Sequence, residues 1–125
     1  MITYLENKLY TLDEVQRIQS SGKIFSTDKI FKVNDENDLF ERKFISISKI
    51  DHIPLSMQWY IDNGKKNEAK FLKHLMDLIQ LGKKIIPIVI TERFQIMDGI
   101  HRYMAYKELK HRKIEVFQRV RGQFG

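Results

Sequence analysis

An apolar run at residues 85–90, followed within a few residues by Asp-Gly-Ile-His-Arg at residues 98–102, constrains the fold most. The continuous apolarity of this run predicts a strand that is buried on both faces, as in a parallel or mixed sheet. Asp-Gly is a turn signal, and the apolar spacing after it predicts a helix over residues 100–110. We therefore expect this strand, a second short strand at residues 94–97 and a tight turn directly before a helix.

The predicted helix opens with His101 and Arg102. The first turn of a helix presents N–H groups without intrahelical partners and a partial positive charge. A guanidinium and an imidazole beside such N–H groups suit a phosphate or a carboxylate. The sequence therefore predicts an anion site at residues 98–102.

Periodicity and capping signals place the other elements. Thr11 and Glu14 form a capping box in front of apolar residues at helical spacing. Residues 67–82 also follow the helical period and end at Gly82. Strict alternation predicts strands. The predicted helices are 12–21, 67–82 and 100–110, the strands 29–33, 43–50, 85–90, 94–97 and 113–120, and residues 34–38 are a solvated loop.

Residues 57–66 leave two interpretations open. Trp59 and Tyr60 precede the turn signal Asp62-Asn63-Gly64. The stretch is either a loop over the site, or its aromatic side chains belong to the core or anchor a loop.

Composition limits the function classes. A chain of 125 residues predicts one domain. The absence of cysteine excludes disulfides, thiolate metal sites and cysteine nucleophiles. No apolar run approaches the roughly 20 residues of a membrane span, and the N-terminus lacks signal-peptide features, which predicts a cytoplasmic protein without a membrane partner. The net charge of +6 predicts anionic partners such as a nucleotide, DNA or RNA, or only a lysine-rich surface that maintains solubility.

The order of motifs over residues 75–118 resembles the ParB/sulfiredoxin-like superfamily. The matching features are Gly82, Pro-Ile-Val-Ile at residues 87–90, Asp-Gly-Ile-His-Arg at residues 98–102, and Ala105. The resemblance implies an α+β fold with a small mixed sheet and flanking helices. It also implies a single domain over residues 1–125, with residues 1–42 as an N-terminal extension and residues 43–121 as the family-like core.

The resemblance implies that His101 and Arg102 bind nucleotide phosphates. Asp98 then holds a magnesium-bound water or a substrate hydroxyl, or it only caps backbone N–H groups of the turn. Gly99 either lets the backbone approach a ligand or serves the turn alone. Lys73 and His74 are polar candidates on the preceding helix, or part of a solvated face. The predicted catalytic residues are Asp98, His101 and Arg102, with Asp98 for metal, and the predicted contacts to ATP or another NTP with Mg²⁺ are Gly99, Ile100, His101, Arg102, Lys73 and His74.

Two departures from the family are informative. Ile100 occupies the position of the catalytic cysteine of sulfiredoxin, so sulfinic-acid reduction by that chemistry is excluded. Serine kinases of the superfamily are larger and use an additional glutamate as base; the sequence assigns that role to no glutamate here, and Glu68 and Glu92 are the residues to consider.

Two main hypotheses about function follow. The first is nucleotide-dependent phosphate chemistry at the Asp-Gly-x-His-Arg site, with NTP hydrolysis or phosphotransfer, or a nuclease-like variant. The second is a non-catalytic nucleic-acid-binding ParB-like module. A regulatory or inhibitor protein of a mobile genetic element is a third class that the small size permits. Basic residues that support the second hypothesis are Lys110, Arg112, Lys113, Arg119 and Arg121.

Overall fold

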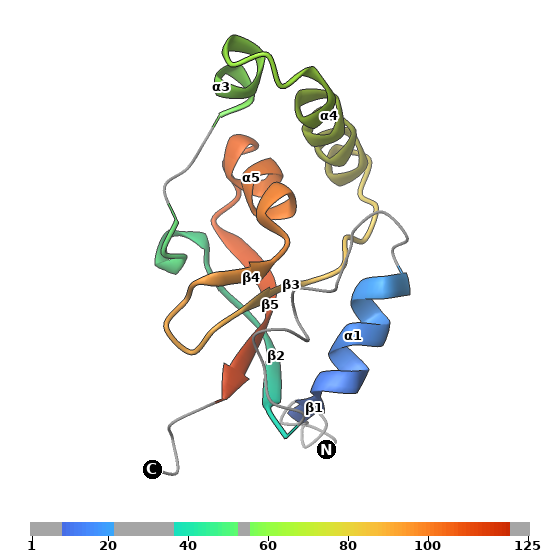
Figure 1. Ribbon diagram of the computed structural model, residues 1–125, viewed down its shortest axis with the longest axis vertical. Helices are drawn as coiled ribbons and strands as arrows, with labels where there is room; N and C mark the ends of the chain where they lie inside the picture. The colour runs from blue at the N-terminus through green and yellow to red at the C-terminus, as the bar shows by residue number, and fades with distance from the viewer. Residues whose placement is uncertain (1–8, 22–36, 53–55, 121–125) are drawn as a thin grey trace.

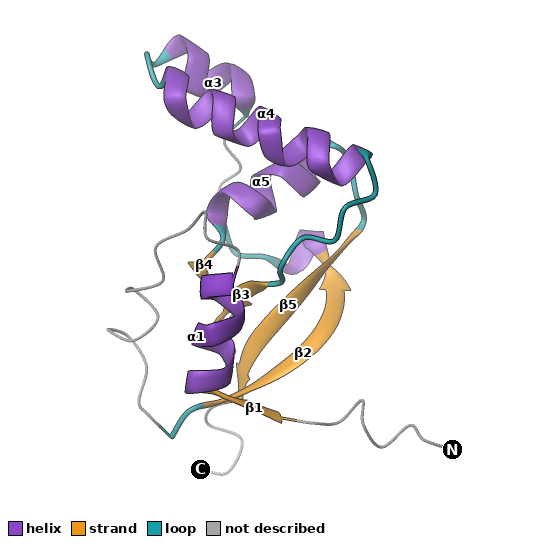
Figure 2. Ribbon diagram, turned by 90° about the vertical axis from the view of Figure 1, so that its right-hand side faces the viewer, coloured by secondary structure: helices purple, strands orange, loops and turns teal. Residues whose placement is uncertain are grey.

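The computed structural model describes residues 9–21, 37–52 and 56–120. A five-stranded mixed sheet has the order β1-β2-β5-β3-β4. Helix α5 lies between this sheet and the α3–α4 pair in both views (Figures 1 and 2). The predicted α+β class with a small mixed sheet and flanking helices is confirmed. None of the helices in the described ranges is long and apolar enough to cross a bilayer.

Strand β5 (Lys113–Val120) forms the centre of the sheet. It pairs antiparallel with all of β2 (Leu39–Ser46) on one side and parallel with β3 (Ile88–Ile90) on the other. Strand β4 (Ile96–Asp98) pairs antiparallel with β3, and β1 (Leu9–Thr11) pairs antiparallel with β2. The parallel β3–β5 pair agrees with the continuous apolar run, because all three residues of β3 are buried.

Helix α1 (Leu12–Ser21) begins as its sequence predicts. The Glu14 N–H donates to Thr11 Oγ1 at 3.1 Å, and the Thr11 N–H donates to Glu14 Oε1 at 3.0 Å. This reciprocal pair satisfies two backbone donors at the helix start. The apolar residues of α1 pack on the sheet in a cluster that comprises Leu12, Val15, Phe40, Val89 and Phe117.

The described elements of the segment predicted as an N-terminal extension, β1 and α1, pack with the sheet. Strand β1 and helix α1 add an edge strand and a second apolar cluster to the sheet. The boundary predicted at residue 43 falls inside β2, which starts at Leu39.

The larger apolar cluster lies where α3 (Met57–Asp62), α4 (Lys66–Gln80) and α5 (Ile100–Glu108) come together with strands of the sheet. Each of these elements contributes buried side chains, and α4 packs directly on α5. Its buried members are Ile45, Ile47, Ile50, Tyr60, Ala69, Leu72, Leu75, Ile88, Ile90, Tyr103, Met104, Ala105, Ile114 and Val116.

Several predicted boundaries were wrong, each for a local reason. The run at residues 85–90 is a strand only from Ile88, directly after Pro87, which has no N–H to donate to a sheet. The strand expected over residues 43–50 ends at Ser46 and continues as a 3₁₀ turn, Ile47–Lys49. The stretch that contains Trp59 is a helix, α3, whose first turn is capped by Ser56 Oγ, and Tyr60 is buried. The strand predicted at residues 29–33 and residues 34–36 of the predicted loop lie outside the described residues.

Candidate functional site

Gly99 connects β4 to α5 in a conformation that requires glycine. Its φ of 105° lies in the left-handed region. A Cβ at this position would lie 2.6 Å from Ile88 Cγ2 and 2.9 Å from Arg102 Nη2. The space beside Gly99 is therefore filled by the protein itself, which favours the turn interpretation of Gly99 over a role in ligand approach.

The Arg102 side chain lies inside the protein and is only 1% exposed. Its Nη1 donates to the carbonyl oxygens of Ile86 at 3.1 Å and Pro87 at 3.0 Å. These carbonyls belong to the extended segment before β3. The Pro87 carbonyl also accepts a hydrogen bond of 2.8 Å from Gln19 Nε2 of α1. Arg102 thus joins α5 to the segment that enters the sheet, and almost none of its guanidinium surface is open to a ligand.

Asp98 provides the negative charge nearest to this guanidinium. Its Oδ2 lies 3.4 Å from Arg102 Nη2. Burial lowers the pKa of Arg102 to about 10, while the Asp98 carboxylate opposes this shift. Arg102 therefore stays protonated at neutral pH, and an internal carboxylate balances its charge. The described residues contain no cluster of three or more metal-ligating side chains at Asp98 or elsewhere.

His101 lies in an aromatic environment built by two helices. Its ring centroid is 5.9 Å from that of Tyr60 in α3 and 5.5 Å from that of Phe71 in α4. Its buried Nε2 makes no hydrogen bond within the described part of the chain. Burial lowers the pKa of His101, and the charge of Glu68 opposes that shift only in part. The imidazole is therefore mainly neutral at pH 7.

This environment makes a pH dependence of stability an expected result. Because the pKa of His101 is lower folded than unfolded, the unfolded state binds more protons as the pH falls below about 6.5. The stability that His101 contributes is fully present above that pH and is lost as the pH falls through the folded pKa. Urea unfolding at pH 7.5 and 5.0 should show a larger loss for the wild type than for His101→Phe, which keeps an aromatic ring but cannot titrate. Equal losses would contradict the assigned environment.

The other predicted contacts lie on the surface. Lys73 and His74 are exposed on α4, and Lys73 pairs with Asp77 at 3.4 Å. Ile100 is exposed at the first position of α5. The positions of Lys73 and His74 agree with the solvated-face interpretation, and their binding roles stay predictions.

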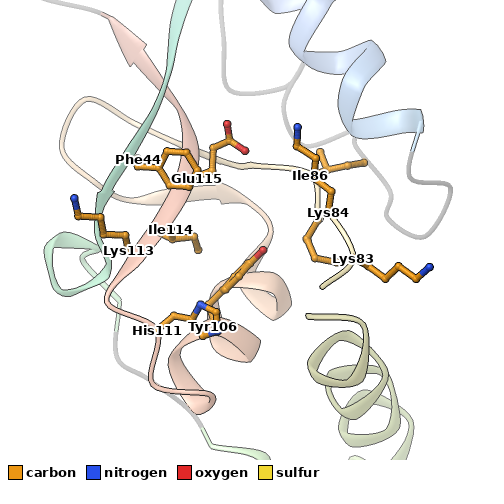
Figure 3. A pocket seen from close by; sticks show the side chains of 10 residues that line it. Phe44, Lys83, Lys84, Ile86, Tyr106, His111, Lys113, Ile114 and Glu115 are labelled. Carbon is orange, nitrogen blue, oxygen red and sulfur yellow. The ribbon is translucent and has the colours of Figure 1, made fainter. Parts of the chain in front are cut away.

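A second set of basic side chains lines a cavity of about 210 Å³. Lys83 and Lys84 precede β3. His111 lies between α5 and β5, and Lys113 is the first residue of β5 (Figure 3). The two aromatic side chains of the lining are Phe44 and Tyr106. The acidic residue of the lining, Glu115, accepts a hydrogen bond of 2.8 Å from Arg42 Nε, so its charge is balanced on the neighbouring strand.

Sequence reasoning missed most of this cavity. Its residues come from β2, the segment before β3, the end of α5 and β5, which only the fold brings together. Of the basic residues predicted for nucleic acid, Lys113 lines the cavity, and Lys110 and Arg112 are exposed close to it in the chain. Arg119 is instead buried and bonded to Glu92 at 2.9 Å. Arg121 lies outside the described residues.

Comparison with known proteins gives similarity in structure only. No protein-family model matches the chain, and no curated protein is significantly similar to it. One similar solved structure, the C2221 form of a Pnob8-like ParB-N domain, has a TM-score of 0.48 and 16% identity and covers 64% of this chain and 29% of its own. Another, a pNOB8-like ParB N-domain, has a TM-score of 0.45 and 17% identity and covers 69% and 30%.

This chain thus spans less than a third of the length of either solved structure. Both of these solved structures are ParB N-domains. The similarity concerns the course of the backbone over about two thirds of this chain.

Proposed function

We propose that this domain is a non-catalytic nucleic-acid-binding module that contacts the phosphate backbone through exposed basic side chains. The observation that carries the proposal is the convergence of Lys83 and Lys84 with His111 and Lys113 around one cavity. Lysine side chains bind phosphates as flexible point charges and release counterions from the nucleic acid. The excess of positive charge, +6 in total, supports the same kind of partner.

The positions of the predicted catalytic residues favour binding over catalysis. Arg102 is bonded to two backbone carbonyls and an internal carboxylate, and His101 is a mainly neutral ring between two aromatic side chains. Neither arrangement offers a free positive charge to a transferring phosphoryl group. The exposed lysines, in contrast, are open to solvent and to a partner.

Replacing both Lys83 and Lys84 with alanine is expected to weaken nucleic-acid binding severalfold. It should also flatten the dependence of log K on log salt by about 0.7–0.9 for each phosphate contact that is lost. Fluorescence anisotropy with a labelled oligonucleotide, measured over a series of salt concentrations, gives both quantities.

The matched control is the double variant Lys65→Ala, Lys66→Ala. It removes the same charge from two adjacent exposed lysines at the opposite end of α4. Equal losses in the two double variants would show that net charge alone acts, and would remove the cavity from the proposal. No binding by the wild type at low salt would overturn the proposed function.

Nucleotide-dependent chemistry stays a second proposal, with one observation in its favour. Gly99, at the start of α5, offers no side-chain cap to the first-turn N–H groups of the helix. Titration calorimetry of the wild type with ATP, CTP and GTP, with and without Mg²⁺, tests it directly. Heat from one nucleotide would support the site at residues 98–102, and no heat from any of them would reject it.

A further inference from the structure

We infer that the cavity between Phe44 and Tyr106 accepts an unpaired nucleobase, so that the module prefers single-stranded nucleic acid. This inference rests on the proposed function and names the form of nucleic acid that the same surface takes. It is carried by the exposed Phe44 ring, by the size of the cavity and by the positions of the lysines around it.

Phe44 is an apolar side chain left in solvent. It lies on β2 opposite Glu115 of β5 and is 66% exposed, although its neighbour Ile45 is buried in the core. A single exposed apolar residue is ordinary. Phe44 differs because it lines a cavity together with four basic side chains and a second aromatic ring. An aromatic ring beside cations is the arrangement on which unstacked bases bind, since every base has a π-face.

The cavity has the size of a small flat group. Its volume of about 210 Å³ lies below the roughly 300–1,000 Å³ of typical small-molecule pockets. A whole nucleoside triphosphate would therefore extend out of it, whereas a base could enter it. The lining suits a base because the half-buried Ile86 provides apolar contact, and the Tyr106 hydroxyl points into the cavity (Figure 3).

The lysines flank the cavity instead of closing it. Lys113 lies on the same side as Phe44, and Lys83 and Lys84 lie on the other (Figure 3). Positive charge on both sides suits a strand whose phosphates precede and follow the bound base. A duplex holds its bases stacked and paired, so it can meet the lysines but cannot offer a base to Phe44.

The test compares Phe44→Ala with the wild type on three labelled probes: a thymidine oligonucleotide, a uridine oligonucleotide and a blunt-ended DNA duplex with the same number of phosphates. The wild type is expected to bind at least one single strand more tightly than the duplex. Phe44→Ala should weaken that binding about tenfold and leave duplex binding unchanged. Phe44→Tyr should restore tight binding, because the aromatic ring is kept.

Leu81→Ala is the control for loss of exposed apolar surface. Leu81 is 73% exposed just before Lys83 and does not line the cavity, so its replacement should change no affinity. If Phe44→Ala binds all probes as the wild type does, while Lys83→Ala, Lys84→Ala weakens all of them, the base-binding inference is overturned and the proposed function stands. If the wild type binds none of the probes, the proposed function fails as well. The two single-stranded probes decide between DNA and RNA.

Discussion

Arg102→Ala is expected to destabilise the domain by about 3–5 kcal/mol, because breaking a buried, hydrogen-bonded charge pair leaves its partners without compensation. The substitution removes the donor to the Ile86 and Pro87 carbonyls and the cation beside Asp98. The buried Asp98 Oδ2 loses its cation and the partly buried Ile86 carbonyl loses its donor, whereas the Pro87 carbonyl keeps its hydrogen bond from Gln19. A buried polar atom that loses its partner keeps its desolvation cost. Urea unfolding followed by circular dichroism measures the loss.

The matched control for this prediction is Arg42→Ala. Arg42 also forms an arginine–carboxylate pair, with Glu115 at 2.8 Å, but both side chains are partly exposed on the sheet. Water can replace the lost contact there, so we expect a cost of about 1 kcal/mol. If Arg102→Ala costs no more than Arg42→Ala, the internal role of Arg102 is contradicted, and its role as a phosphate ligand regains support.

Gly99→Ala is expected to cost about 3 kcal/mol or more. Two penalties add at this position. A residue with a Cβ is strained at a φ of 105°, by about 1–3 kcal/mol. The added methyl group also has to displace Ile88 and the Arg102 guanidinium, at 2.6 and 2.9 Å, and overpacking of this kind costs about 1–3 kcal/mol. Thermal or urea unfolding gives the total.

Gly64→Ala separates the two penalties. Gly64 also has a positive φ, 72°, but a Cβ there meets nothing within 4 Å. Only the left-handed backbone is penalised, so we expect a loss of about 1 kcal/mol. A Gly99→Ala variant as stable as Gly64→Ala would mean that the turn before α5 relaxes easily and that the close packing of Ile88 and Arg102 is not required.

Local signals predicted the elements well where they do not depend on distant residues. The Thr11–Glu14 capping box and the alternation over residues 113–120 correspond to α1 and β5 as observed. The Asp98-Gly99 turn leads directly into α5, as expected. Each of these signals depends on hydrogen bonds or periodicity within a few residues.

Predictions about the site were weaker, because they depend on where a side chain points in the fold. An arginine in the first turn of a helix is an ordinary phosphate ligand in sequence terms. Helical side chains point back toward the N-terminus of the helix, however, and from this position Arg102 reaches the carbonyls of residues 86 and 87. Arg102 and Gln19 meet at Pro87 only because α1 packs beside β3. No spacing in the sequence indicates that meeting.

The cavity shows the same limit more strongly. Phe44 comes from an alternating strand, which predicts one buried face but does not say which alternate residues lie in solvent. Lys83 and Lys113 are far apart in the sequence and meet only through the sheet. Charge composition indicated an anionic partner, whereas the place where it would bind required the fold.

The central position of β5 has a consequence for the synthesis of the protein. In the described part of the chain β5 is the last strand to be translated, yet β2 and β3 are joined only through it. A nascent chain that has emerged as far as residue 112 contains the other four strands without the one that connects them. Apolar residues such as Phe40 and Ile88 then lack the buried residues of β5 that they pack against. Apolar surface exposed in this way promotes aggregation and binding by chaperones. We therefore expect this domain to complete its folding only after β5 has left the ribosome.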